Sequence, residues 1–503
     1  MVSIIKTVAF QGIDALPVDV QVQLSSGLPA FTIVGLPDKA VSEARERVRA
    51  ALTALGLSLP VQRITINLSP ADLPKEGSHY DLPIALGLLV AMDILPGEEL
   101  EQTIVMGELG LDGSIRRVSG VLPAAVTALT LKASIVCPAD CGPEAAWAGE
   151  ELPILAPDSL IALLNHFRGH FSLNRPEPIA MQPKEVLHDF KDVKGQETAK
   201  RVLELAAAGG HTVLMTGPPG SGKSMLASRL PSILPSLRAP EILEVSMIAS
   251  IAGELGEEGI TNRRPYRDPH HSASMPALIG GGQRAQPGEI SLSHCGILFL
   301  DELPEFNRVA LEGLRQPLET GQVMIARAQA RVTYPAQFQL IAAMNPCRCG
   351  YLDDPSRACS RAPKCALDYQ KKISGPLLDR IDLYIDVSEL SAQELLNPGE
   401  AERSSTIAKR VAICRDRQRE RFKRLNAPHR MNAEANGEIL ELIAPLDAAC
   451  HSLLKTAIQD FKFSARAYHR VLKVARTIAD LAFSEAIKEH HIAEALSYRK
   501  LTY

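Results

Sequence analysis

The sequence predicts an α/β fold with two α/β domains followed by a helical region. Short β-rich runs mix with helical stretches in residues 1–168, and residues 186–392 alternate apolar strands with helices, which is typical of a mostly parallel sheet. Residues 393–503 contain no convincing strand and are expected to be helical. Residues 169–185 carry three prolines and no periodic apolar pattern, so they are predicted to be a linker.

Composition limits the classes of protein that the sequence can encode. The 503 residues are 46% hydrophobic, enough for several buried cores, and the formal net charge is −4. A protein that coats nucleic acid with its whole surface is usually basic, so any contact with nucleic acid is expected to be local. The sequence has no apolar run long enough for a membrane span and no signal-peptide pattern at its start, so a cytoplasmic location without membrane contact is predicted.

The clearest motif lies in the second α/β domain. The strand pattern of residues 211–216 leads directly into a glycine-rich loop, and the helical run 225–230 follows. The loop residues are Gly217, Pro218, Pro219, Gly220, Ser221, Gly222, Lys223 and Ser224. Such a loop turns backbone N–H groups inward around phosphates at a helix N-terminus. ATP is therefore predicted to bind here, with Lys223 reaching its β and γ phosphates and Ser224 holding Mg²⁺.

Two further strands end in polar residues that suit the same site. Residues 296–300 run into Asp301 and Glu302, where Asp301 would hold Mg²⁺ through water and Glu302 would polarise the attacking water. Residues 338–344 end at Asn345, a candidate for orienting the water near the γ-phosphate. A carboxylate pair at a strand end is common by itself, but its position downstream of the phosphate loop favours the catalytic interpretation.

Two arginines are candidates for completing the site. Arg380 would act as a finger that reaches the γ-phosphate bound by a neighbouring subunit, which requires a ring; the alternative is a salt bridge with Asp379 or Asp382. Arg466, at the start of a helix, is the candidate for a second phosphate sensor, with Arg470 in reserve.

Four cysteines lie close together after Asn345. Cys347, Cys349, Cys359 and Cys365 could supply four thiolates to a zinc ion, although their spacing is not the familiar pair of C-x2-C motifs. The surrounding segment is poor in apolar residues, which favours a metal that holds it together. Four unligated thiols are the alternative.

These motifs, together with several others, resemble the magnesium-chelatase-like AAA+ proteins, and more closely the ComM/YifB family, over nearly the full length. The additional motifs are Gly35–Asp38, Leu68–Lys75, Arg264–His271, Pro287–Leu292 and Leu377–Asp382. The resemblance implies a P-loop AAA+ core in residues 186–392 and a helical C-terminal lid in residues 393–503. It also implies a homo-hexameric, ATP-driven DNA helicase that moves branched junctions in homologous recombination and natural transformation, with Arg466 as well as Arg380 supplied by a neighbour.

The resemblance also implies two insertions in the core, one at about residues 246–262 and one hairpin before Asn345. The hairpin, residues 323–334, is similar to the pore hairpin of MCM helicases, in which a basic residue contacts the DNA backbone. Arg327 matches that position, and Arg331 on the same hairpin is the second DNA-contact candidate. Six copies would line a channel with positive charge, which reconciles a DNA partner with the acidic net charge. Exposed arginines without a ligand are the alternative. His270 and His271 are expected to be structural or ring-contact residues.

Residues 1–168 resemble the Lon protease domain, a fold similar to domain 2 of ribosomal protein S5. Where that family has its nucleophile, this sequence has His79, with Ser78 one position earlier, and residues 119–126 contain no Lys. A Ser–Lys pair needs both partners, so no peptidase activity is expected. The alternative function for the whole chain is a chelatase-type or remodelling ATPase that acts on a protein partner.

Overall fold

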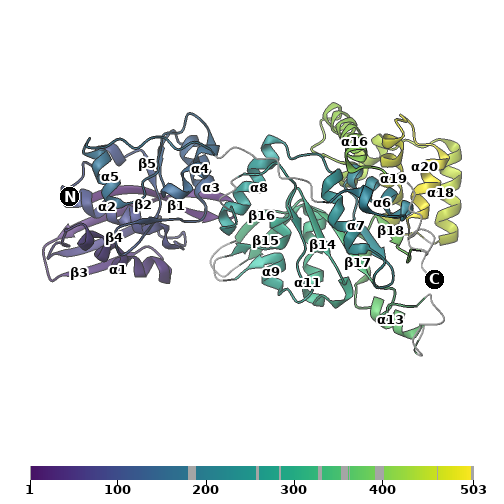
Figure 1. Cartoon of the computed structure of the whole chain (residues 1–503), viewed down its shortest axis with the longest axis horizontal. Coiled ribbons are helices and arrows are strands. Elements are labelled where there is room, and N and C mark those ends of the chain that lie inside the picture. Colours follow the sequence, from purple (N-terminus) through teal and green to yellow (C-terminus); the bar gives the residue numbers. More distant parts are fainter. Residues whose placement is uncertain are drawn as a thin grey trace.

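The computed structural model describes residues 2–178, 188–255, 260–282, 285–326, 331–352, 361, 363–390, 401–461 and 463–499. The molecule is elongated, with an N-terminal sheet domain at one end, a second sheet in the middle and the C-terminal helices at the other end (Figure 1). The α/β class with a parallel sheet and a helical C-terminal region is confirmed. In these residues no helix is long and apolar enough to cross a membrane.

The N-terminal domain is built on a seven-stranded mixed sheet with the order β3-β4-β2-β1-β5-β8-β9. Inward residues alternate with outward ones along β1, β2 and β4, as expected for a sheet that buries one face. The strands are β1 (Val2–Gln11), β2 (Asp14–Ser25), β3 (Ala30–Val34), β4 (Arg63–Ser69), β5 (Thr103–Val105), β8 (Ser134–Val136) and β9 (Ile154–Leu155). The helices are α1 (Lys39–Ala54), α2 (Asp81–Ala91), α3 (Val121–Thr130), α4 (Gly142–Ala145) and α5 (Leu160–Phe167).

Local sequence explains how this domain is assembled. The Asp38 carboxylate accepts the Val41 N–H at 2.7 Å and caps α1. Helix α2 is buried on nearly all sides and packs on β1 and β2, and at Gly87 an added Cβ would collide with Val22. A helix that is apolar all round is therefore placed between the sheet and the rest of the domain.

The central sheet has five parallel strands in the order β11-β14-β17-β10-β18. Chain order reverses at β10, whose neighbours are β17 on one side and β18 on the other, and ligands bind at such switch points. The strands are β10 (Val213–Thr216), β11 (Tyr266–Arg267), β14 (Ile297–Leu300), β17 (Gln339–Met344) and β18 (Leu383–Asp386). The glycine-rich loop follows β10 at this switch point.

Helices and a hairpin cover the sheet. Those of the core are α6 (Glu197–Gly209), α7 (Lys223–Arg229), α8 (Ala239–Ala252), α9 (Met275–Ile279), α10 (Glu289–Leu292), α11 (Arg308–Gly313), α12 (Arg315–Thr320), α13 (Lys364–Gln370) and α14 (Gly375–Leu378). Strands β15 (Gln322–Ala326) and β16 (Arg331–Pro335) form the hairpin, as an antiparallel pair. The C-terminal helices are α16 (Ser404–Arg424), α17 (Gly437–Ile443), α18 (Ala448–Phe461), α19 (Ala465–Leu481) and α20 (Glu489–Ser497). All five contribute to one hydrophobic core with α6.

The N-terminal domain touches the core at two places. Helix α3 packs against α8, where the Gly120 N–H donates to the Ser250 carbonyl at 3.0 Å and the Ser250 hydroxyl donates to Glu144 at 2.5 Å. The turn after β1 lies against the hairpin: at Gly12, whose φ is +70°, an added Cβ would collide with the Thr333 carbonyl. Of the predicted linker, residues 171–178 form neither helix nor strand.

Candidate nucleotide-binding site

The glycine-rich loop joins β10 to α7. Gly222 lies in the left-handed region, with φ at +92°, and Lys223 begins α7. At Gly217 an added Cβ would collide with the carbonyl of Val387, which follows the neighbouring strand β18. The loop therefore needs glycine at both positions, one for its turn and one for close packing against the sheet.

Lys223 lies inside this loop. Its ammonium group donates to the carbonyls of Gly217 and Pro218, both at 2.8 Å, and lies 3.4 Å from Asn345 Oδ1. Burial lowers the pKa of Lys223, while the nearby Asp301 and Glu302 act in the opposite direction. A phosphate group would offer this buried cation a stronger partner than the two carbonyls.

Strand β14 brings Asp301 to the start of α7. The Ser224 hydroxyl donates to Asp301 Oδ2 at 2.6 Å, and Asp301 Oδ1 accepts the Glu302 N–H at 2.8 Å. A hydroxyl and a carboxylate held together are ligands that Mg²⁺ prefers. Glu302 has φ at +52°, an unusual conformation for a non-glycine residue, and its side chain is about half exposed.

His271 lies beside Glu302, a proximity that the sequence interpretation missed. Its Nδ1 is 3.2 Å from Glu302 Oε2, and its ring stacks against that of His270 with centroids 4.1 Å apart. The position of His271 shortly after β11 could have indicated this contact. Strand β11 pairs with β14 in parallel, so the carboxyl ends of both strands lie at the same edge of the sheet. His271 is therefore a neighbour of the predicted catalytic carboxylate.

Arg380 lies at the opposite edge of the central sheet from the loop. The Thr212 hydroxyl, at the start of β10, donates to the Arg380 carbonyl at 2.7 Å. The Arg380 guanidinium pairs with Glu319 and donates to the Pro376 carbonyl at 2.6 Å. The alternative salt bridge to Asp379 or Asp382 is wrong, because α12 brings Glu319 closer. Within one chain Arg380 does not meet the phosphate loop.

Arg466 and Arg470 lie at the same edge. Arg466 is exposed, and both line a cavity of about 740 Å³ that also includes Arg380. Arg470 pairs with Asp382 and donates to the Arg380 carbonyl at 2.9 Å. Burial alone would raise the pKa of Asp382, but Arg470 and His211 outweigh it and hold that pKa well below its usual range. Arg470 thus has a partner in its own chain, whereas Arg466 faces solvent.

The structure describes only one of the two arginines that are candidates for DNA contact. Arg327 lies outside the described residues, whereas Arg331 is exposed at the start of β16. The Arg331 carbonyl accepts the Gln11 side-chain amide at 3.1 Å, and its side chain lines a cavity of about 1030 Å³ between the hairpin and the N-terminal domain.

Ser78 and His79 line that same cavity. His79 is buried, its Nε2 lies 2.9 Å from the Val8 carbonyl, and burial lowers its pKa to about 4. The His79 imidazole is therefore a neutral group that contacts the backbone and packs in the interior of the N-terminal domain. Within the described residues, no hydrogen bond joins Ser78 or His79 to a lysine ammonium.

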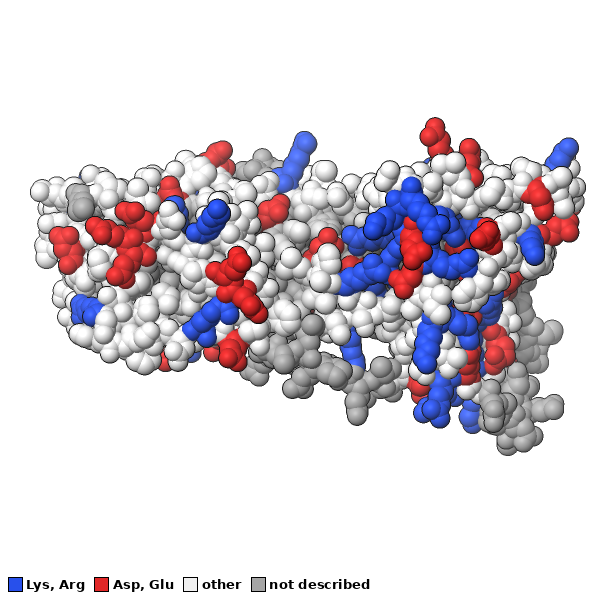
Figure 2. Space-filling view, turned by 90° about the horizontal axis from the view of Figure 1, so that it is seen from above, with Lys and Arg blue, Asp and Glu red and all other residues white. Residues whose placement is uncertain are grey.

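Other basic side chains gather on the face that carries α16 (Figure 2). Many of them are tied to acids or carbonyls of this chain. Arg410 pairs with Glu204, Arg421 pairs with Asp480, and Arg415 donates to the Ala207 carbonyl at 2.7 Å. Much of the positive charge on α16 therefore attaches the C-terminal helices to the core.

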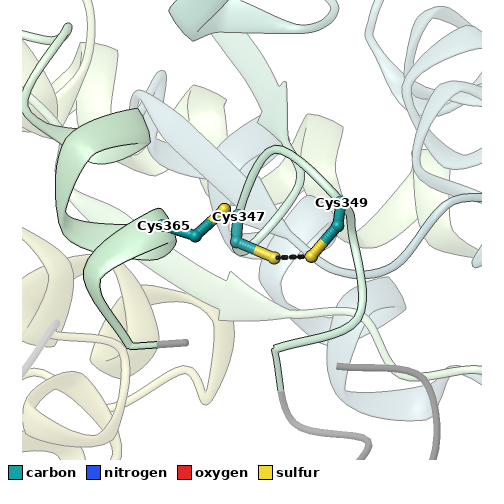
Figure 3. Close-up of side chains that lie close together, drawn as sticks. All are labelled: Cys347, Cys349 and Cys365. Atoms are coloured by element: carbon teal, nitrogen blue, oxygen red, sulfur yellow. Dashed lines mark hydrogen bonds between the residues drawn. The ribbon is translucent and has the colours of Figure 1, made fainter. Parts of the chain in front are cut away.

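Three of the four predicted cysteine ligands lie together (Figure 3). Cys347 Sγ is 3.0 Å from Cys349 Sγ, and Cys365 Sγ lies within 4.8 Å of both. Cys359 is outside the described residues. Burial and the neighbouring Cys349 raise the pKa of Cys347 to about 11. None of the cysteines that the structure describes forms a disulfide.

Comparisons with known proteins match the chain from end to end. The magnesium chelatase ChlI subunit family matches residues 189–395, a second ChlI family matches residues 20–140, and the ChlI C-terminal family matches residues 401–499. The chain is 43% identical to the uncharacterized protein YifB of Escherichia coli K12, over 99% of this chain and 97% of that protein. It is 42% identical to the competence protein ComM of Haemophilus influenzae, over 99% and 97%.

A more distant match is the magnesium-chelatase 67 kDa subunit of Chlorobaculum parvum, 28% identical over 33% of this chain and 25% of that protein. The full-length relatives and the three family matches agree with the phosphate loop and parallel sheet described above. The chain therefore belongs to the YifB/ComM family of magnesium-chelatase-like AAA+ proteins, a family that implies ATPase activity with ATP and Mg²⁺.

Proposed function

We propose that the chain is an ATP-driven, hexameric DNA motor: a cytoplasmic branch-migration helicase that promotes the integration of DNA in homologous recombination and natural transformation. The observation that carries this proposal is the division of basic and phosphate-binding groups between opposite edges of one sheet. The Haemophilus influenzae relative, named a competence protein, supports the biological setting.

In this proposal the carboxyl edge binds ATP and Mg²⁺. The loop N–H groups and the start of α7 receive the phosphates, and Lys223 exchanges its two carbonyl partners for phosphate oxygens. Ser224 and Asp301 would hold Mg²⁺, which neutralises phosphate charge. Glu302 orients the attacking water, and Asn345 lies beside Lys223 where it can contact the same water.

The opposite edge would serve the neighbouring subunit. Arg380 and Arg466 are at the far end of β10 from their own phosphate loop, so they can reach ATP only across a subunit interface. An interface in which one edge meets the other is head-to-tail, and such interfaces close into rings. A hexamer places one composite site at every interface.

DNA would pass through the channel of that ring. The β15–β16 hairpin carries Arg331 in its described part and Arg327 beyond it. Guanidinium groups repeated around a ring bind phosphates without reading sequence. The N-terminal domain, for which we propose a Lon-like fold without peptidase activity, touches this hairpin and would serve ring assembly or DNA contact.

The second candidate function is a chelatase-type or remodelling ATPase that acts on a protein partner. The ChlI family matches favour it, because they cover each part of the chain. The two functions differ in what stimulates ATP turnover.

The deciding experiment measures ATPase activity with and without branched and single-stranded DNA at low salt. We expect stimulation by DNA, and weaker DNA binding with a shallower salt dependence for Arg327→Ala and Arg331→Ala, since each phosphate contact contributes about one unit to the salt slope. Arg45→Ala, at an exposed position of helix α1, is the matched control. Absence of DNA binding and of stimulation would reject the motor in favour of the protein-directed ATPase.

A further inference from the structure

Three sulfur atoms lie close together near the segment that follows β17 and Asn345. Cys347 and Cys349 belong to one turn, and Cys365 lies in the first turn of α13, with its sulfur directed at Cys347 (Figure 3). The thiols come from two segments, and the Gln370 side chain donates to the Pro346 carbonyl at 3.0 Å and holds α13 against the turn. The cluster is thus formed by tertiary structure as well as by sequence proximity.

We infer that Cys347, Cys349 and Cys365 bind a zinc ion as thiolates. Sulfur ligands of tetrahedral zinc lie about 2.3 Å from the metal, which places them slightly less than 4 Å from one another. The mutual separation of these sulfurs, at most 4.8 Å, needs only small side-chain rotations to meet that geometry. Soft thiolates select zinc over the hard Mg²⁺ of the nucleotide site.

The basic residues near the cluster suit the charge of a zinc–thiolate site. Three thiolates around one divalent ion leave a net negative charge, and Arg348, Arg361 and Lys364 lie next to these cysteines in the chain. The helix that carries Cys365 buries Ala366 and Tyr369 but leaves Leu367 54% exposed. A metal would join this helix to the turn that carries Cys347 and Cys349.

Among the described residues a second group, Glu244, His294 and Cys295, is also close enough to ligate a metal. There the Arg430 guanidinium lies 3.7 Å from Cys295 Sγ and 3.9 Å from Glu244 Oε2. A permanent cation already occupies the position that a metal would take, so this group carries no metal site.

Zinc at the cluster would brace the nucleotide loop. The Gly350 N–H donates to the Cys347 carbonyl at 3.0 Å and closes the turn, and at Gly350 an added Cβ would collide with the Pro219 ring. The turn that carries two thiols therefore lies against the phosphate loop on one side and follows Asn345 on the other. Zinc binding does not depend on ATP turnover, whereas this bracing rests on the proposed function.

The test begins with the metal content of the full-length protein, purified without chelators and measured by elemental analysis. We expect about one zinc per chain. Cys349→Ser and Cys365→Ser should each lose most of it, whereas Cys450→Ala, a buried cysteine in α18, should keep it. Cobalt exchanged into the unmutated chain should show thiolate-to-metal charge-transfer bands and tetrahedral d–d bands.

Metal-free protein with native circular dichroism would overturn the site, as would iron in place of zinc or zinc retained by a Cys349→Ser/Cys365→Ser double variant. The bracing is measured separately, as the equilibrium affinity for a fluorescent ATP analogue before and after zinc removal. A several-fold weaker affinity in the stripped protein, restored by zinc, supports it. An unchanged affinity rejects the bracing, and unmeasurable ATP binding in the zinc-loaded protein rejects the proposed function itself.

Discussion

The two edges of the central sheet hold polar groups in different ways. At the carboxyl edge, side chains at the start of α7 contact side chains that follow β14 and β17: Lys223 contacts Asn345, and Ser224 contacts Asp301. At the opposite edge two arginines each pair with an acid, Arg380 with Glu319 and Arg470 with Asp382. The first edge offers a lysine and a loop of backbone N–H groups to an anion, whereas Arg380 and Arg470 at the second edge are already paired with acids.

This difference has an energetic consequence for Arg380. Its side chain is 8% exposed, but that of Glu319 is 55% exposed. An ion pair with one partner in solvent contributes roughly 0–1 kcal/mol, so exchanging Glu319 for a phosphate would cost little. Arg470 and Asp382 are both largely buried, and breaking that pair would leave an uncompensated charge. Arg380 is therefore the arginine that can change partners, and Arg470 is the one that cannot.

The largest effect is expected at the carboxyl edge. Lys223→Ala removes the buried cation, so ATP turnover should fall below detection in a steady-state phosphate-release assay. Lys409→Ala, an exposed lysine on α16, is the control and should retain most of its activity. Substantial turnover by the Lys223 variant would show that this loop does not hold the reacting phosphates.

The next prediction tests whether the two edges act together across an interface. Arg380→Ala alone should lose on the order of 10³-fold in turnover if it acts as an arginine finger. Mixing it with the equally inactive Glu302→Gln chain should restore activity, because roughly a quarter of the interfaces in random rings then combine two intact edges. The measurement is ATPase activity against mixing ratio. Activity that stays absent at every ratio would mean that Arg380 serves its own chain.

A smaller effect is expected at His271. His271→Ala frees Glu302 from its neighbour at 3.2 Å, so turnover should change by a few fold while nucleotide affinity stays nearly constant. Equilibrium binding and steady-state rates, measured on the same preparation, separate the two quantities. His188→Ala, an exposed histidine at the start of the core domain, is the control. A large loss of ATP affinity would assign His271 to binding.

The carboxyl edge could be predicted from sequence because its residues lie in a glycine-rich loop motif after β10 or directly follow the apolar strands β14 and β17. Asp301 and Asn345 need only the rule that parallel strands end at one edge. The partner of Arg380 could not be predicted, because Glu319 reaches it through the packing of α12, which no local pattern encodes. The contact of His271 with Glu302 was missed for a related reason. Strand β11 has only two residues, so the sequence pattern does not show that it belongs to the sheet.

The close approach of Gly12 to Thr333 has a consequence for how force would be carried. The two backbones meet without an intervening side chain, and Gln11 bonds the Arg331 carbonyl beside them. Any displacement of the hairpin along DNA would push directly on the turn after β1, and through it on the long β1–β2 pair. In the proposed motor, the N-terminal domain would therefore move each time the hairpin moves, and it would take part in transmitting force.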